Sequence, residues 1–367
     1  MSGTRRKKKL PPLFVIKVTM SLRNFFLKIG RNMLPPSFIM LEEVSKIWKL
    51  KAIEIVAKLN IADLLKNGPQ PVEKLAEQTA NDALALYRVM RALAAEGIFK
   101  ELPGKVFKNT RLSNALADQN ESVKYFSLHH LGDTNWELTG DMHYCVETGN
   151  DAFGHKFNSQ PFEFLEKNPE QNSIFNKAMT ETAELSGSIL VDSYPFGNFK
   201  TIVDIGGGQG LFLAQILTVN THSKGILADQ PHVAGSAHDT FKKLGLLERC
   251  SIVECSFFET VPANGDLYIM KNILHDWDDE TSVKLLKNLY NAMPQKSRLL
   301  IIETIIKPDN KPSFGKFIDL QMLIGTQGGK ERTMEEFNKI IAESGFRFNK
   351  VIHNATPFSF IEAVKNN

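Results

Sequence analysis

The sequence has no acidic residue in its first 41 positions, only three cysteines and no long apolar run. No stretch approaches the roughly 20 apolar residues of a membrane-spanning helix, so we expect no stable membrane insertion. Lys17 interrupts the apolar segment 13–20, which makes it a poor core for a secretion signal. The cysteines Cys145, Cys250 and Cys255 lack metal-type spacing, and they predict reduced thiols in a cytoplasmic protein.

The missing acidic residues divide the chain into a basic extension and a slightly acidic body. Nine Lys and Arg residues precede Glu42, and the remaining 35 basic residues face 41 acidic ones. The body therefore lacks the broad positive field of sequence-independent nucleic-acid binding, and we expect no nucleic-acid partner. We expect residues 1–37 to be a basic, disordered extension, within which 22–29 could form a short amphipathic helix.

Apolar periodicity predicts two domains joined by a helical connector. Helices at 39–65, 71–78 and 82–96 and a hairpin at 98–108 give residues 38–115 the outline of a winged-helix unit. Residues 116–195 are mostly helical and are expected to contribute to a substrate pocket. Over 196–367, strands alternate with helices, which indicates an α/β fold with a parallel sheet covered on both faces. The predicted strands are 201–205, 225–228, 251–253, 267–270, 298–303, 347–352 and 358–361, with helices at 209–219, 232–244, 279–293 and 334–344.

A glycine loop follows the first of these strands, in the run Val203-Asp204-Ile205-Gly206-Gly207-Gly208-Gln209-Gly210. Glycines allow a tight turn and a close approach to a ligand, and the next helix offers unpaired N–H groups. Asp229 ends the following strand, where a carboxylate can accept hydrogen bonds from ribose hydroxyls. Leu211 stands where a dinucleotide site has its third glycine, and Asp204 would repel a diphosphate but tolerate a sulfonium. The pattern favours S-adenosylmethionine over a nicotinamide dinucleotide or a turn without a ligand.

Three further polar residues lie where ligands of open α/β sheets gather. His275 follows a strand at the carboxyl side of the sheet, Glu303 ends the next strand, and Glu331 sits in a glycine turn. A histidine there could be a general base, and either glutamate could orient its ring. The same residues could also be structural, and Asp276 could be a helix cap.

Six motifs in order make the chain resemble the plant caffeate-type and hydroxyindole-type O-methyltransferases and their bacterial relatives that act on polyketides, phenazines and similar metabolites. The motifs are Val203–Gly210, Asp229–His232, Asp266–Lys271, Leu274–Trp277, Leu300–Glu303, and Gly328–Thr333 with Glu336-Phe337. The resemblance covers residues 38–365. It implies a winged-helix-like dimerisation domain, a seven-stranded Rossmann-like methyltransferase sheet, a homodimer and a role in secondary metabolism.

The resemblance also implies which residues bind S-adenosylmethionine. Asp229 would hold the ribose, Gly206 and Gly208 would face the methionyl end, and Lys271 would lie beside the cofactor. The cofactor-binding set is Asp204, Gly206, Gly208, Asp229, Gln230, Ser256, Phe257 and Lys271, with Phe258 beside Phe257 near the adenine. The family commonly has an aspartate where this chain has Ser256, so the contact to the adenine amino group would lose its charge assistance.

By the same resemblance, His275 is the catalytic base, Glu303 and Glu331 orient it, and Asp276 contacts the acceptor. Met179 and Met322 fall where the family clamps an aromatic ring, although both could be ordinary core residues. No metal-binding cluster is evident, so we expect methyl transfer to a hydroxyl without a metal. A diverged hydroxylase or decarboxylase, or a winged-helix regulator that senses a ligand, remains an alternative. The sequence does not specify the acceptor. The aromatic and histidine residues expected near its pocket are Phe126, His129, His130, Trp136, Phe153 and Phe162.

Overall fold

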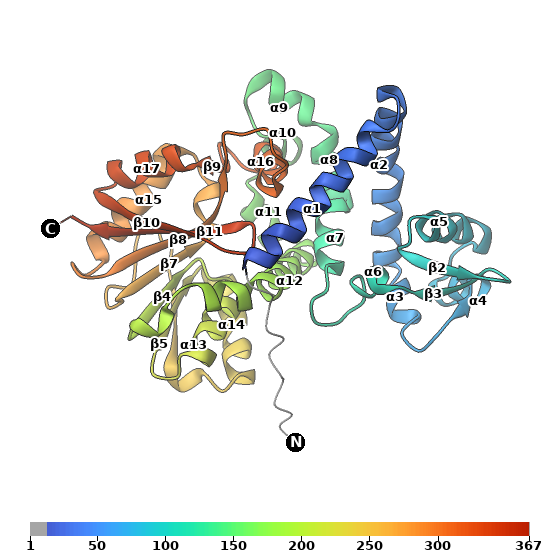
Figure 1. Ribbon diagram of the computed structural model, residues 1–367. Coiled ribbons are helices and arrows are strands. Elements are labelled where there is room, and N and C mark those ends of the chain that lie inside the picture. The colour runs from blue at the N-terminus through green and yellow to red at the C-terminus, as the bar shows by residue number, and fades with distance from the viewer. Residues whose placement is uncertain (1–12, 367) are drawn as a thin grey trace.

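The computed structural model describes residues 13–366 and confirms the α/β class, with a helical unit joined to a large mixed sheet (Figure 1). The two units lie at opposite ends of the molecule, and helices of the connector lie between them (Figure 1). The most basic part of the extension, at 5–9, falls outside the described residues. Within the described part, no helix combines the length and apolar character that a membrane crossing requires.

The N-terminal unit has the predicted winged-helix outline. Its elements are α1 (Leu13–Asn32), α2 (Pro36–Lys58), α3 (Ile61–Leu64), α4 (Val72–Thr79), α5 (Ala83–Ala95), β1 (Gln70–Pro71), β2 (Phe99–Leu102) and β3 (Val106–Asn109). The strands form a small antiparallel sheet in the order β1-β3-β2. The single helix expected over 39–65 is split, because Asn60 adopts a left-handed conformation with φ 55° between α2 and α3. Helix α5 begins where Asp82 caps the backbone N–H of Ala85 at 2.7 Å.

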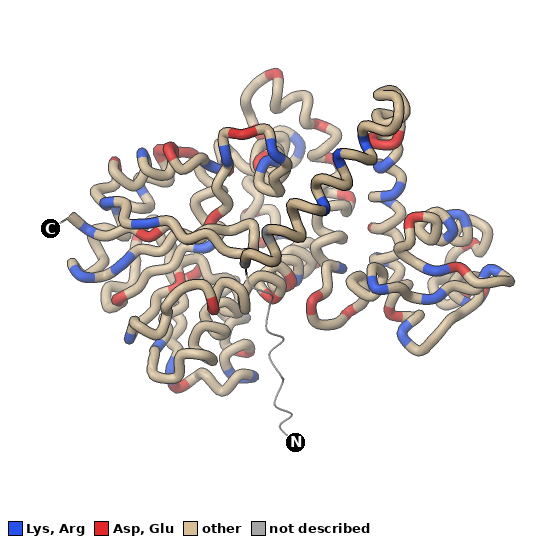
Figure 2. The backbone as a smooth tube through the Cα atoms, viewed as in Figure 1, with Lys and Arg blue, Asp and Glu red and all other residues tan. Residues whose placement is uncertain are grey.

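The expectation of a disordered extension does not hold for Leu13–Asn32, which form α1. Apolar side chains recur at helical spacing at Phe14, Val18, Leu22 and Phe25, and this periodicity favours a helix longer than the 22–29 segment considered from the sequence. Figure 2 shows basic positions and no acidic position along α1.

The connector is helical, as expected. After α6 (Arg111–Asn114) at the end of the N-terminal unit, the connector comprises α7 (Lys124–Leu131), α8 (Asp133–Gly140), α9 (Met142–Thr148), α10 (Ala152–Phe157), α11 (Pro161–Lys167) and α12 (Pro169–Ser193). Helix α12 packs against α7 on one side and against α13 (Leu211–Val219) on the other. It therefore links the N-terminal unit to the sheet.

The C-terminal sheet runs in the order β10-β11-β8-β7-β4-β5-β6, with the two-residue β9 beside β8. Its strands are β4 (Thr201–Ile205), β5 (Lys224–Asp229), β6 (Cys250–Glu254), β7 (Leu267–Lys271), β8 (Arg298–Ile306), β9 (Arg332–Thr333), β10 (Phe346–His353) and β11 (Phe358–Lys365). Strands β4 to β8 are parallel, whereas β11 runs antiparallel to both of its neighbours, β8 and β10, at one end of the sheet. The chain order reverses at β4, which has β5 on one side and β7 on the other, and ligands of open α/β sheets bind at such a switch point.

Alternating strand residues supply the two cores above and below the sheet. Ile202 packs with the side chains of α13 and α14 (Pro231–Lys243), whereas Val203 packs with α15 (Asp279–Ala292) and α17 (Met334–Glu343). Short 3-10 turns occur at Phe196–Asn198, Leu247–Arg249 and Leu274–Asp276. The sequence prediction missed α16 (Phe314–Gly325) and β9.

Candidate active site

A cavity of about 410 Å³ opens at the carboxyl ends of β4, β5 and β7. The sheet side contributes the glycine loop and the ends of these strands, and the opposite side is formed by α7, α11, α12 and α16. Its walls therefore come from segments more than 100 residues apart in the sequence.

The glycine loop forms one wall of the cavity. Gly206 has φ 66°, which only glycine adopts easily, and a side chain at Gly207 would collide with Leu227 and Asp204 at 2.3 and 2.5 Å. Asp204 is buried at the end of β4, and its Oδ2 has no hydrogen-bond partner among the described residues. Burial raises the pKa of Asp204 to about 7, although Lys271 opposes this rise. Strand β4 thus places a desolvated carboxyl beneath the loop, where a nearby positive charge would stabilise its ionised form.

Asp229, at the end of β5, holds the loop from the other side. Its Oδ2 accepts the N–H of Gly208 at 2.7 Å, and its Oδ1 accepts the N–H of Gln230 at 2.7 Å. Each carboxylate oxygen has two lone pairs, so both can accept further hydrogen bonds from a ligand in the cavity. Phe257 also lines the cavity, whereas Ser256 does not.

His275 lies on the 3-10 turn after β7 and is surrounded by carboxyl groups. Its Nδ1 is 3.0 Å from Glu331 Oε1 and 3.6 Å from Glu303 Oε2, and its Nε2 is 3.6 Å from Asp276 Oδ1. Both glutamates lie on the Nδ1 side of the ring. Nε2 points in the opposite direction, so these glutamates do not block a ligand from reaching it. This pairing can fix the tautomer and stabilise an imidazolium.

The electrostatics of this cluster make His275 unlike an ordinary histidine, whose pKa is about 6.5. Burial lowers the pKa of His275, but Glu303, Asp276 and Glu331 outweigh it and raise the pKa to about 10. Burial raises the pKa values of Glu303 and Glu331, and His275 opposes this rise in both. The ring therefore has a high affinity for a proton in the protein without ligands.

The turn that carries His275 is held from two sides by opposite charges. Glu303 Oε1 accepts the N–H groups of Ile273 and Leu274 at 2.9 and 3.0 Å. The fully buried Arg332 donates to the carbonyl oxygens of Leu274 and Trp277, both at 2.7 Å.

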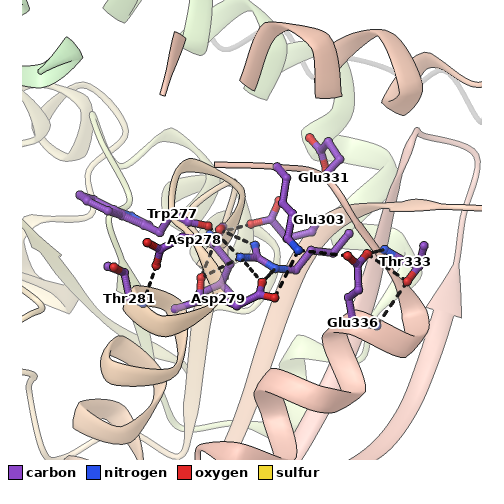
Figure 3. A network of polar contacts seen from close by, with 12 residues as sticks. Trp277, Asp278, Asp279, Thr281, Glu303, Glu331, Thr333 and Glu336 are labelled. Carbon is purple, nitrogen blue, oxygen red and sulfur yellow. Dashed lines mark hydrogen bonds and ion pairs between the residues drawn. The ribbon is translucent and has the colours of Figure 1, made fainter. Parts of the chain in front are cut away.

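Arg332 is itself fixed by donation to Asp279 Oδ1 at 2.9 Å and to Ser282 Oγ at 3.2 Å. Figure 3 shows the polar contacts of this region, with Trp277, Asp279 and Glu303 labelled among them and Glu331 nearby. This role of Arg332 could not be expected from the sequence, because it depends on the contacts between β9 and the distant helix α15.

The structure brings most predicted site residues to one cavity. Those that line it are Met179, Asp204, Gly206, Gly208, Asp229, Gln230, Phe257, Lys271, His275, Asp276, Met322 and Glu331. Glu303 lies behind His275, fully buried. Of the uncertain aromatic and histidine positions, Phe126, His129, His130, Phe153 and Phe162 line the cavity, whereas Trp136 does not.

Asn272 is one of the cavity residues that had not been considered from the sequence. Asn272 follows β7 with φ 55°, a conformation that asparagine tolerates better than most residues. It turns the chain between Lys271 and the His275 turn, and its buried Oδ1 has no partner among the described residues. An asparagine directly after a strand was the available signal.

Two family models match the chain. An O-methyltransferase domain matches residues 136–347, and an O-methyltransferase dimerisation domain matches residues 41–119. A phenazine O-methyltransferase of Lysobacter antibioticus is 38% identical over 330 residues, covering 90% of this chain and 96% of the relative. A mitomycin biosynthesis 6-O-methyltransferase of Streptomyces lavendulae is 32% identical, covering 86% and 90%.

The chain is also similar to a solved structure that contains bound ligands. It is an O-methyltransferase from neocarzinostatin biosynthesis in complex with S-adenosylmethionine and 2-hydroxy-5-methyl naphthoic acid. It is 26% identical, has a TM-score of 0.76, and covers 87% of this chain and 96% of its own.

Proposed function

The chain belongs to the O-methyltransferase family, and from this premise we propose that it transfers a methyl group from S-adenosylmethionine to a hydroxyl of a small aromatic metabolite. One observation carries the proposal. His275, with Glu331 at 3.0 Å, lines the same cavity as the glycine loop at 206–208. This arrangement supports a reaction between a cofactor at the loop and an acceptor beside His275, within one cavity.

The residues of the cofactor half fit S-adenosylmethionine. The unpartnered Asp204 Oδ2 suits a positively charged ligand, and Asp229 suits ribose hydroxyls. Phe257 offers an aromatic face for the adenine. When bound, the cofactor supplies an electrophilic methyl carbon on a positively charged sulfur. We propose Asp204, Gly206, Gly208, Asp229, Gln230, Phe257 and Lys271 as the residues that hold it. Ser256, which stays outside the cavity, is a weaker candidate.

We propose that His275 removes the proton of the acceptor hydroxyl through Nε2. A phenol with a pKa of about 10 is almost wholly neutral at pH 7, and a positioned base typically contributes about 10²–10⁴-fold to such a reaction. Glu331 and Glu303 stabilise the resulting imidazolium from the Nδ1 side. Met179, Asp276 and Met322 are proposed to contact the acceptor.

The proposed function can be tested by mass spectrometry. The protein is incubated with S-adenosylmethionine and a panel of phenols, and products are examined for the gain of one CH₂ unit. We expect a methylated product in equal amount to S-adenosylhomocysteine. A hydroxylated or decarboxylated product formed without S-adenosylhomocysteine would instead favour the diverged chemistry, and specific DNA binding without turnover would favour the regulator.

Replacing Asp229 with asparagine should weaken binding of S-adenosylmethionine about 10–100-fold, because hydrogen bonds to a charged group contribute about 1.5–3 kcal/mol. Isothermal titration calorimetry measures this affinity. Asp266 is a matched control, because its carboxylate accepts the N–H groups of Lys200 and Thr201 at the opposite end of the sheet. An equal loss of affinity in the Asp266→Asn variant would contradict the assignment.

Activity should survive chelation of metal ions. Ligand atoms of His275, Glu303 and Glu331 lie within 4.8 Å of one another, which is close enough for a cation. We attribute this cluster to control of the histidine proton, because Nδ1 already pairs with Glu331 at 3.0 Å. Turnover with a millimolar excess of EDTA should therefore equal turnover without it. A loss that Mg²⁺ or Zn²⁺ restores would overturn the metal-free mechanism.

The rate should rise with pH in the neutral to alkaline range. The pKa of His275 is raised to about 10, so the ring is mostly protonated below that pH and the base form increases about tenfold per pH unit. The positively charged sulfur of S-adenosylmethionine should lower the pKa of His275 when the cofactor binds, and the rise in rate should then occur at lower pH. The Glu331→Gln variant should shift it further down, because Glu331 helps to raise the pKa. The control is an acidic phenol that is fully ionised at pH 8, because titration of such an acceptor cannot contribute to the pH profile above that pH. An unshifted pH profile in the Glu331→Gln variant would contradict the assignment.

We propose that the chain acts as a homodimer in the cytoplasm. Large apolar side chains are exposed along α2, including Phe38, Leu41, Val44 and Trp48, and a patch of this kind marks an interaction surface. The dimerisation model begins at residue 41, within α2. We retain the division into segments 1–37, 38–115, 116–195 and 196–367 as a working description.

A further inference from the structure

The end of the cavity formed by the connector contains two adjacent histidines, His129 and His130, on α7. Both rings are partly buried among aromatic side chains. The centroid of His130 is 4.1 Å from that of Phe126, and the centroid of His129 is 5.3 Å from that of Phe175. The two imidazoles are 4.8 Å apart. An aromatic surface with two polar rings is thus available to a flat ligand.

Neither imidazole has a hydrogen-bond partner for its ring nitrogens among the described residues. Within residues 13–366, the structure shows no hydrogen bond to a ring nitrogen of His129 or His130, although each neutral ring has one donor and one acceptor. Their ring nitrogens are not among the buried side-chain atoms without a partner, so they stay accessible and can hydrogen-bond to water or to a ligand that displaces it. Both side chains line the cavity that also contains His275.

This end of the cavity is uncharged. Burial lowers the pKa of His129 to about 4, and burial together with His129 lowers the pKa of His130 to about 3. Lys271 is the single Lys or Arg among the described residues that line the cavity, and it lies at the end of β7 beside Asp204. Glu181, on the adjacent α12, is engaged by the backbone N–H of Phe126 at 2.8 Å. An anionic group here would have no cation to pair with, and burial of an unpaired charge is strongly unfavourable.

We propose that His129 and His130 form a second recognition point for the acceptor, which binds an uncharged hydrogen-bonding group remote from the hydroxyl that is methylated. The chemical class that fits is a planar, fused-ring phenol that carries a carbonyl, a ring nitrogen or a second hydroxyl. This inference rests on the proposed function and adds the polarity of the acceptor to it. A distal carboxylate is disfavoured by the lack of a cation.

The test uses four related acceptors with the full-length protein: 1-naphthol, a dihydroxynaphthalene, a hydroxynaphthoquinone and a hydroxynaphthoate. Binding to the protein loaded with S-adenosylhomocysteine is measured by calorimetry, and kcat and KM are measured with S-adenosylmethionine. We expect the two neutral, disubstituted acceptors to bind at least about threefold more tightly than 1-naphthol, since one neutral hydrogen bond corresponds to roughly 3–10-fold. The naphthoate should bind least well.

Variants assign this preference to the two rings. His129→Leu and His130→Leu should each raise KM for the neutral disubstituted acceptors roughly 3–10-fold, with little change for 1-naphthol or S-adenosylmethionine. The Asn variants retain a donor and an acceptor and should recover part of the loss. His155→Leu is the matched control, because His155 also stacks on an aromatic ring, Tyr144, but lies outside the cavity. Thermal melting identifies any variant that does not fold, and the Asn variants then carry the comparison.

The outcomes separate this inference from the proposed function. If the protein methylates 1-naphthol or the naphthoate as efficiently as the neutral disubstituted acceptors, the inference is overturned and the methyltransferase assignment stands. If the Leu variants change KM equally for every acceptor, the rings contribute shape alone and the inference is again overturned. If no acceptor binds or is methylated, the second recognition point and the acceptor class both fall.

Discussion

Replacement of His275 with asparagine should lower kcat about 10²–10⁴-fold, the range that a positioned general base contributes. Asparagine keeps a polar side chain of moderate size but cannot accept the proton. The KM for S-adenosylmethionine should change little, because the proposed cofactor contacts, which lie on β4, β5, the loop at 206–208, Phe257 and Lys271, do not include His275. Steady-state kinetics at saturating cofactor, with calorimetry for cofactor affinity, measures both effects.

The size of this loss should depend on the acidity of the acceptor. A phenol with a pKa near 10 needs a base at pH 7.5, whereas a nitro-substituted phenol that is already ionised does not. The loss in His275→Asn should therefore shrink by at least about tenfold for the acidic phenol. The Glu331→Gln variant, which weakens support at Nδ1 but keeps the base, should show a smaller loss with the same trend. An equal loss for both acceptors would mean that the imidazole positions the substrate without taking its proton.

Much of the sheet and its adjoining loops could be predicted from the sequence, because local patterns specify them. The strand predicted at 201–205 coincides with β4, and the glycine loop follows it directly. Asp229 and Lys271 end parallel strands, so the chain order alone brings them to one edge of the sheet. His275 and Glu331 were assigned together by resemblance, and their separation of 3.0 Å is consistent with that pairing.

The acceptor half of the cavity could not be predicted in the same way, because it depends on contacts between distant helices. His129 and His130 reach the cavity only through the packing of α7 against α12. The sequence analysis did not predict helix α16, which carries Met322 and lies between β8 and β9. Its apolar residues showed no distinct helical periodicity. Ser256, which stands where the family commonly has an aspartate, does not line the cavity. Side-chain protonation was also beyond the sequence, since the pKa of His275 depends on three carboxyl groups from different segments.

Replacement of Arg332 with lysine should lower kcat about 10–100-fold and destabilise the fold by about 3 kcal/mol or more, because a buried charge loses its hydrogen-bonded partners. The planar guanidinium donates in several directions at once, and a lysine ammonium cannot reproduce this fork. Arg332 donates to the carbonyl oxygens on both sides of His275 and Asp276, so the turn should lose its fixed position relative to Glu331. A displacement of about 1 Å in a reacting group can cost about 100-fold in rate.

Stability and catalysis can be separated with Arg249, which donates to three backbone carbonyls at 2.9, 2.9 and 3.2 Å away from the cavity. The Arg249→Lys variant should lose stability in urea unfolding but keep kcat near that of the unmodified protein. In Arg332→Lys, kcat should fall while KM for S-adenosylmethionine stays within about threefold. Since cofactor contacts do not involve Arg332, a parallel rise in that KM would indicate general disruption of the fold.

Chemical rescue gives the sharper distinction for a residue that acts through another. In an Arg332→Ala variant, guanidinium at low millimolar concentration can occupy the space left by the side chain and donate to the carbonyls of Leu274 and Trp277. We expect a saturable recovery of kcat, with the pH-rate profile returning toward its original position as the His275–Glu331 pair is restored. The same concentration of guanidinium should not change kcat of an Arg249→Ala variant. Since the two arginines make similar carbonyl contacts, recovery confined to Arg332→Ala would place the effect on the turn that carries His275, and no recovery would make the role of Arg332 structural alone.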